Sequence, residues 1–201
     1  MESKDVISTK FSCIIVAGGR GTRFGRKKQN VKWHGKALWR HVYDKCLQVS
    51  DDVIVVGYSK LGRQGAIYNG LQRVKYRRVV ILEAARPAVT VEQIKRIGED
   101  VHPSTSYAME SVDTIYYTMN IACSFHLNRK TTLQVQVPQA FDTQILKDAH
   151  KKFKGANSTS DSQLVEDCYH IKTHFIIGGR NLTKVTYPED LKILDVICDE
   201  I

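Results

Sequence analysis

The sequence predicts an α/β domain built on a mostly parallel sheet. Three short apolar runs rich in β-branched residues, 11–17, 53–57 and 79–82, are typical of strands that are buried on both faces. Stretches with helical periodicity follow these runs, and strands that alternate with helices favour parallel pairing. The 201 residues, 42% of them hydrophobic, suffice for one domain with a full core, so residues 1–201 are taken as a single unit.

The first half of the chain contains the helices that are expected between and after these strands. Gly18 and Gly19 end the first strand, and Leu38, Val42 and Leu47 then recur at helical spacing. Helices are expected over residues 37–49, 64–74 and 91–97.

The second half has a different pattern. Residues 133–137 alternate apolar and polar side chains, as in a half-exposed strand, and they follow the basic residues 128–130. We therefore expect them to form one side of a protruding hairpin. The remaining expectations are a helix over 142–153, a loop rich in Gly, Asn, Ser and Thr over 155–162, a strand over 174–178, and a last helix that opens at Pro188.

The net charge of +9, from 30 Lys and Arg against 21 Asp and Glu, indicates an anionic partner. No apolar stretch approaches the roughly 20 residues of a membrane span, and no secretory signal follows the polar start. We therefore expect a cytoplasmic protein without a membrane partner. The five cysteines are scattered and predict neither a disulfide framework nor a zinc site. No recognition-helix or aromatic-platform pattern supports nucleic acid as the partner.

The segment that follows the first strand carries the chemical information. Residues 17–25 read AGGRGTRFG, which matches neither the Rossmann nor the Walker glycine spacing. Glycines at the end of a strand still allow backbone N–H groups to approach phosphate oxygens. Arg23, Lys27, Lys28 and Arg20 supply cations around the same volume, where open α/β sheets bind ligands. The alternative is a surface turn whose basic side chains are merely solvated.

Several motifs in order resemble one enzyme family. VAGGRGTRFG at 16–25, with KQ at 28–29 and GK at 35–36, is similar to the start of the sugar-nucleotidyltransferase superfamily. The later motifs are AARP at 84–87, VPQAF at 137–141, DSQLVE at 161–166 and KVTYPEDL at 184–191. Together they resemble the cytidylyltransferases that act on methylerythritol 4-phosphate or ribitol 5-phosphate. This resemblance implies a three-layer, Rossmann-like fold with a protruding β-arm at about 115–137.

The resemblance also implies roles for particular residues. CMP would pass from CTP to a small phosphorylated acceptor, with release of pyrophosphate and with Mg²⁺ bound near Glu83. The implied catalytic residues are Arg23, Lys28 and Lys184. The implied nucleotide-binding residues are Ala17, Gly18, Gly19, Gly21, Arg63, Ala66 and Ala84, and the implied substrate-binding residues are Arg86, Thr114 and Arg129. Arg129 would come from the second subunit of a homodimer that the arm holds together.

The chain departs from the family pattern at five places. The stretch between Val56 and Glu83 is short, and Ala66 stands where a serine is usual. Glu83 replaces an aspartate, and Val112 and Val137 replace polar residues. These departures leave open an atypical phosphorylated acceptor for an active cytidylyltransferase. They also leave open two alternatives to that activity: an enzyme that uses another nucleoside triphosphate, and a catalytically silent relative that binds nucleotide or a partner.

Overall fold

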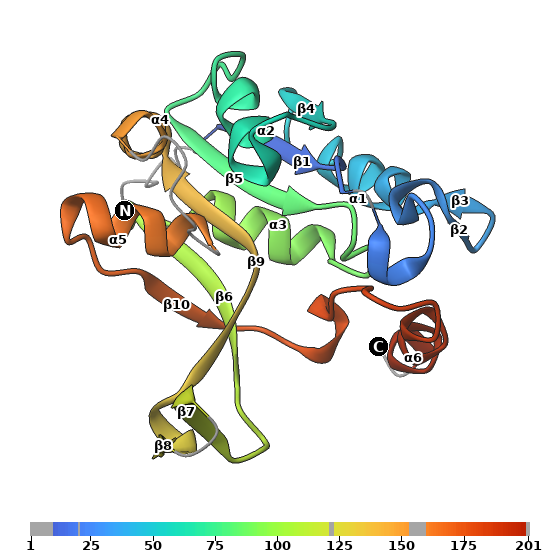
Figure 1. Cartoon of the computed structure of the whole chain (residues 1–201). Helices are drawn as coiled ribbons and strands as arrows, with labels where there is room; N and C mark the ends of the chain where they lie inside the picture. Colours follow the sequence, from blue (N-terminus) through green and yellow to red (C-terminus); the bar gives the residue numbers. More distant parts are fainter. Residues whose placement is uncertain (1–9, 20, 121–122, 153–159, 200–201) are drawn as a thin grey trace, which may run out of the picture.

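A six-stranded sheet forms the centre of the molecule (Figure 1). The computed structural model describes residues 10–19, 21–120, 123–152 and 160–199. The strand order is β10–β6–β9–β5–β1–β4, with bounds β1 Phe11–Val16, β4 Val53–Val56, β5 Arg78–Glu83, β6 Ser104–Glu110, β9 Leu133–Asp142 and β10 His174–Ile177. β4, β1 and β5 run parallel, as do β10 and β6, whereas β9 is antiparallel to both of its neighbours. The predicted α/β class with a mostly parallel sheet is confirmed.

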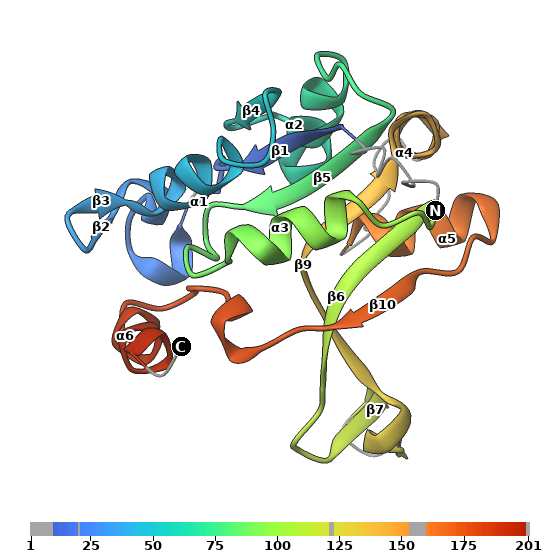
Figure 2. The ribbon, with the colours of Figure 1, turned by 180° about the vertical axis from the view of Figure 1, so that it is seen from behind.

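Helices cover both faces of the sheet and make it the middle of three layers (Figures 1 and 2). Alternate residues of β1 point to opposite faces, so Cys13 and Ile15 pack with one set of helices and Ile14 with the other. The first face carries α1 Leu38–Cys46 and α3 Val91–Gly98; the second carries α2 Gly62–Leu71, α4 Thr143–Lys152 and α5 Asp161–Tyr169.

Capping side chains define where two of these helices begin. Thr90 and Gln93 form a reciprocal capping box at the start of α3. The Ser160 hydroxyl accepts a hydrogen bond of 3.1 Å from the Gln163 amide and caps α5. The loop expected over 155–162 was therefore wrong at its end, because Asp161 and Ser162 already lie in α5. Residues 153–159 lie outside the described part of the chain.

β9 corrects the prediction for residues 133–137. These residues form the start of a ten-residue strand that runs on to Asp142 through the middle of the sheet. Leu133 pairs with Glu110 of β6, and Ala140 pairs with Val80 of β5. The strand is therefore a shared sheet element, and the hairpin that protrudes is made by other residues.

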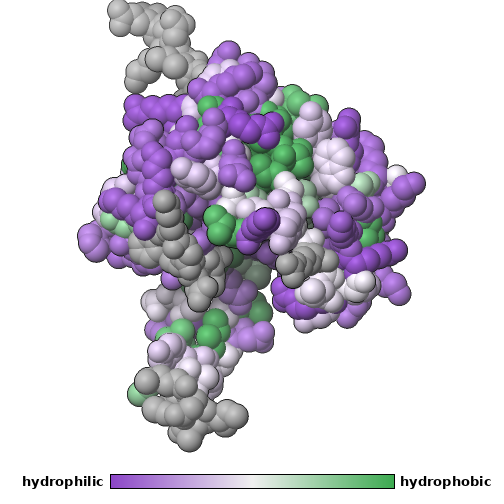
Figure 3. Space-filling view, turned by 45° about the horizontal axis from the view of Figure 1, so that its top comes forward, coloured by the Kyte–Doolittle hydropathy of each residue, from purple (hydrophilic) through white to green (hydrophobic). Residues whose placement is uncertain are grey.

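The protrusion consists of β7 Ile115–Asn120 and β8 Cys123–Leu127, which pair antiparallel (Figures 1 and 2). We call β7 and β8 the arm. Tyr116, Tyr117 and Phe125 on it are 57–61% exposed, and apolar side chains are visible on this projection in Figure 3. Among the described residues, no helix is both long and apolar enough to cross a bilayer.

A smaller cluster fixes the C-terminal segment beside the sheet. Helix α6 Asp190–Asp199 contributes Leu194, which packs with Phe24, Leu38 and Val185. The Val185 amide donates to the Ala85 carbonyl at 2.8 Å and ties this segment to the end of β5. The remaining elements are the strand pair β2 Lys32–Trp33 and β3 Lys36–Ala37, and the 3₁₀ turns Thr22–Phe24, Lys28–Asn30, Arg129–Thr131 and Arg180–Leu182.

Candidate active site

A cavity of about 430 Å³ opens at the carboxyl ends of β1, β4 and β5. This is the position at which open α/β sheets bind their ligands. Among the described residues, five cationic side chains and one carboxylate line it. The cations are Arg23, Lys28, Lys60, Arg63 and Lys184, and the carboxylate is Glu83. The excess of positive charge suits a polyphosphate.

The loop after β1 forms one wall of this cavity, and two of its glycines are sterically required. A Cβ on Gly18 would lie 2.2 Å from the Gly57 carbonyl oxygen, because the loops after β1 and β4 touch there. Gly21 has φ of +69°, and a Cβ on it would lie 1.8 Å from the Arg26 carbonyl oxygen. Gly19 also lines the cavity but has open space around its Cβ position. The sequence therefore folds into a close-fitting wall at which backbone N–H groups can meet phosphate oxygens.

Lys28 and Lys184 reach the cavity from opposite ends of the chain. The Lys28 ammonium donates to the Val185 carbonyl at 2.7 Å, which holds it beside the segment that carries Lys184. Partial burial, then the nearby charges of Lys184 and Arg23, lower the pKa of Lys28 against the opposing effect of Glu83. An anion bound beside Lys28 would offset both the partial burial of its charge and the repulsion from Lys184 and Arg23.

Glu83 lies at the centre of the cationic groups. Its carboxylate is 2.9 Å from the Lys184 ammonium, 3.4 Å from Nε of Arg63 and 3.6 Å from Nε of Arg86. Burial alone would raise the pKa of Glu83, but the charges of Lys184, Arg63 and Arg86 outweigh it and lower the pKa to about 2. The carboxylate is therefore ionised at neutral pH, and it holds three cations in place.

Arg63 is held from its other side by a second buried carboxylate. One guanidinium nitrogen lies 2.8 Å from Oδ2 of Asp161, whose side chain is 1% exposed. Oδ1 of Asp161 lies 3.2 Å from Nε2 of His150. Burial would raise the pKa of Asp161, yet the interactions with Arg63 and His150 lower it to about 2. These contacts form a continuous series of interacting side chains. The series links His150 in α4, Asp161 in α5, Arg63 in α2 and Glu83 at the end of β5.

A second cavity of about 410 Å³ adjoins the first, and the two share Arg63, Glu83 and Lys184 as walls. Its other walls come from Arg86, from β9, from α5 and from the start of β10. The shared cations can therefore face two phosphorylated ligands at once, one in each cavity.

The structure brings most of the predicted site residues together. Gly18, Gly19, Gly21, Arg23, Lys28, Arg63, Ala66, Glu83 and Lys184 line the first cavity, and Arg86 lines the second. Ala17 and Ala84 do not line either. The Ala84 side chain is 2% exposed within the core, so the predicted nucleotide contact of Ala84 stays a prediction for its backbone. Arg20 lies outside the described residues.

Thr114 and Arg129 also lie away from both cavities of the chain. Thr114 is exposed just before β7, and Arg129 donates to the Val112 carbonyl at 3.1 Å at the base of the arm. Neither residue lines the two cavities of its own chain.

The sequence did not predict several residues that line the first cavity or support its walls. Tyr58, Ser59 and Lys60 line the first cavity from the loop after β4, which carries no recognisable motif. Asp161 and His150 were missed as supports of Arg63, since a buried ion pair between helices leaves no signal in spacing. Thr186 also lines the first cavity. It belongs to the KVTYPEDL motif, from which its position could have been predicted.

Comparison with known structures supports the fold. A 4-diphosphocytidyl-2C-methyl-D-erythritol synthase from Anaerococcus prevotii superposes with a TM-score of 0.81 at 20% identity, covering 96% of this chain and 99% of that one. The 2-C-methyl-D-erythritol 4-phosphate cytidylyltransferase of Thermus thermophilus gives a TM-score of 0.76 at 18% identity, covering 92% and 98%.

Sequence comparison supports the family. Residues 13–64 match the MobA-like NTP transferase domain, and residues 45–200 match the 2-C-methyl-D-erythritol 4-phosphate cytidylyltransferase model. The Aquifex aeolicus enzyme of that name is 30% identical over 213 residues, covering 94% of this chain and 99% of the relative. With the glycine loop and the converging cations, these matches show that the chain belongs to the 2-C-methyl-D-erythritol 4-phosphate cytidylyltransferase family and is a nucleotidyltransferase.

Proposed function

We propose that this enzyme transfers CMP from CTP to 2-C-methyl-D-erythritol 4-phosphate and releases pyrophosphate. The observation that carries the proposal is the first cavity, in which a glycine loop and five cationic side chains surround a volume of about 430 Å³. The family match and the relatives named for this acceptor support the choice of substrate.

The proposed reaction is an in-line displacement at phosphorus. A phosphate oxygen of the acceptor attacks the α-phosphorus of CTP, and a new P–O bond forms. The bond to the bridging oxygen of the β-phosphate breaks, and its electron pair leaves with pyrophosphate. No side chain needs to bond to the substrate, so catalysis depends on position and charge.

The cations divide this work between them. Lys28 and Arg23, on the loop side, would stabilise charge on the transferred and leaving phosphates. Lys184, on the wall between the two cavities, would hold the α-phosphate and the acceptor phosphate together. Arg86, which lines only the second cavity, would bind the acceptor from its far side.

A divalent metal belongs to this chemistry, since the family depends on one in general. We propose Mg²⁺, which is usually held by one or two carboxylates together with substrate phosphates. Glu83 fits that requirement, because it is an ionised carboxylate on the cavity wall. The metal would neutralise charge on the triphosphate when bound. The Lys184 ammonium lies 2.9 Å from the same carboxylate, so Lys184 and the metal would share it.

The arm supports a further part of the proposal, a homodimer. Its exposed aromatic residues Tyr116, Tyr117 and Phe125 would be buried against a second copy, and Arg129 at its base would reach that copy's acceptor cavity. The proposed location, the cytoplasm, supplies the CTP. Sedimentation of the purified chain tests the dimer, which should dissociate when Phe125 and Tyr117 are replaced by serine.

Pyrophosphate release tests the function directly. The chain is incubated with Mg²⁺, with CTP, UTP, ATP or GTP, and with methylerythritol 4-phosphate or ribitol 5-phosphate. We expect release with CTP and methylerythritol 4-phosphate, and a diphosphate product by phosphorus NMR. Release with another nucleotide would move the specificity to that nucleotide. No release with any pair, combined with thermal stabilisation by CTP, would identify a silent nucleotide binder.

A further inference from the structure

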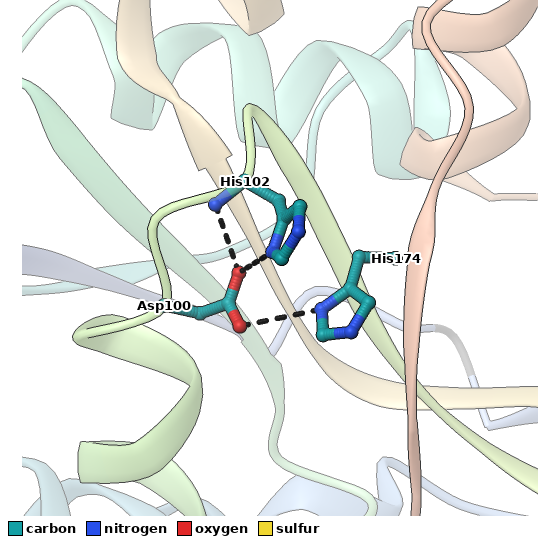
Figure 4. A group of neighbouring side chains, drawn as sticks. All are labelled: Asp100, His102 and His174. Carbon is teal, nitrogen blue, oxygen red and sulfur yellow. Dashed lines mark hydrogen bonds and ion pairs between the residues drawn. The ribbon is translucent and has the colours of Figure 1, made fainter.

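A second cluster of chemically active side chains lies at the edge of the sheet opposite to the nucleotide cavity. Asp100 follows α3, His102 precedes β6, and His174 is the first residue of β10. β6 and β10 are parallel neighbours, and His174 pairs with Thr105. The two histidines therefore lie side by side where these strands begin (Figure 4). β5 and β6 run in the same direction, because both are antiparallel to β9. The cavity lies at the carboxyl end of β5, whereas the two histidines lie at the amino ends of β6 and β10.

Both imidazole rings direct Nδ1 at the same carboxylate. Nδ1 of His102 lies 2.9 Å from Oδ1 of Asp100, and Nδ1 of His174 lies 3.3 Å from Oδ2. The ring centroids are 3.9 Å apart, and one ligand atom from each residue lies within 4.8 Å of the other two. Ligand atoms around a tetrahedral zinc ion with bonds of about 2.0–2.1 Å are roughly 3.3 Å apart. The two nitrogen–oxygen separations, 2.9 Å and 3.3 Å, are close to that value.

The surroundings hold the carboxylate firmly. The Thr105 hydroxyl donates to Oδ1 at 2.6 Å and the His102 amide donates at 3.0 Å, while the Asp100 side chain is only 13% exposed. Such hydrogen bonds to a ligating carboxylate are typical of the outer shell of metal sites. The histidine side chains are 49% and 42% exposed, so an ion can reach them from solvent.

One nearby charge opposes a cation at this place. The Arg78 guanidinium lies 3.8 Å from Oδ1 of Asp100, and it is engaged by the carbonyls of His102 and Ile97 and by Thr105. The positive charge of Arg78 lowers the affinity for any cation. The two imidazole nitrogens favour zinc and similar transition ions over Mg²⁺ or Ca²⁺, which prefer oxygen ligands.

We propose that Asp100, His102 and His174 bind a divalent transition ion of the zinc class, with water in the fourth position. The ion would replace the protons shared at the two Nδ1 atoms and would join the turn after α3 to the start of β10. β10 is an edge strand, and the segment that follows it carries Lys184 into the nucleotide cavity. The bound ion would therefore hold the start of β10 in place.

Titration of the chelator-treated full chain with ZnCl₂, without nucleotide, tests the proposal. We expect one equivalent to bind with a rise in melting temperature, and Co²⁺ in its place to give tetrahedral visible absorption bands. The double variant His102→Ala/His174→Ala should lose this equivalent, whereas the control His34→Ala/His126→Ala, which removes two other exposed histidines, should keep it. Excess Mg²⁺ should not displace the ion.

The variants must remain folded for this comparison. Circular dichroism checks the fold, and His174→Gln, which keeps a polar side chain at an exposed strand start, serves as the milder substitution. Weaker zinc binding in that variant by tenfold or more supports the site. Equal zinc binding by wild type and the double variant, or no binding by folded wild type, overturns the proposal.

Discussion

Replacing Asp161 by asparagine tests whether a buried carboxylate positions Arg63. The side chain of Asp161 is 1% exposed and lies between Arg63 at 2.8 Å and His150 at 3.2 Å. The variant Asp161→Asn keeps the shape and one hydrogen-bonding oxygen but removes the charge. Arg63 would then retain only the more distant Glu83 carboxylate, at 3.4 Å, among the ion-pair partners described.

The expected cost follows from the surroundings of Asp161. Its pKa falls from 3.8 to about 2, and each unit corresponds to roughly 1.4 kcal/mol in favour of the ionised form. Removing one partner of a buried pair costs about 3–5 kcal/mol, and asparagine retains part of the contact. We expect a loss of about 2–4 kcal/mol. In a chain of this size that lowers the melting temperature by roughly 5–15 °C.

Thermal unfolding and steady-state kinetics measure the two consequences. Because Arg63 lines both cavities, its loss of position should raise KM for CTP several-fold. The matched control is Asp148→Asn, which removes a more exposed carboxylate, paired with Lys151 on α4, and should change neither quantity. If Asp161→Asn melts within roughly 2 °C of wild type and keeps its KM, the carboxylate does not hold Arg63 and the reasoning fails.

Three other predictions follow from the same site. Lys28→Ala should lower kcat by roughly 100- to 1000-fold with a small change in CTP affinity, while exposed Lys27→Ala stays near wild type; equal losses in kcat and affinity would assign Lys28 to ground-state binding. Gly18→Ala should abolish CTP-induced thermal stabilisation, because its Cβ would lie 2.2 Å from a backbone oxygen, whereas Gly19→Ala should retain it. The pKa values of Glu83 and Asp161, about 2 in the folded chain against 4.5 and 3.8 ordinarily, imply stability that is full above pH 5 and lost as the pH falls toward 2. Melting curves across that range check this, and the pH dependence should be weaker in Asp161→Asn.

The parts of the fold that could be predicted are those in which local pattern and tertiary role agree. The runs at 11–17, 53–57 and 79–82 are apolar because both faces of β1, β4 and β5 are covered, and the sequence signal is correspondingly strong. α5 was missed because its buried N-terminal turn holds Asp161 and Ser162, which are residues of loops as often as of helices. Ser160 caps that turn locally, and the tertiary partners Arg63 and His150 hold Asp161 in it.

The candidate site divides in the same way. The glycine loop was predictable since its backbone geometry demands glycine at Gly18 and Gly21. Lys184 could be placed only by resemblance, because its closeness to Lys28 depends on the pairing of Val185 with the end of β5. β9 was predicted as a short half-exposed strand, and its buried part escaped notice because the alternation stops where both faces become covered.

An anion site built from many cations needs a group that holds the cations in defined places. Two unit charges at 4 Å repel by roughly 4 kcal/mol near a protein surface, so Arg63, Arg86 and Lys184 would otherwise turn toward solvent. The Glu83 carboxylate contacts all three, and Asp161 holds Arg63 from its other side. A triphosphate and an acceptor phosphate can then take over these contacts without moving the guanidinium groups far. The ion pairs of Glu83 therefore give it a positioning role that is separate from the proposed role as a metal ligand.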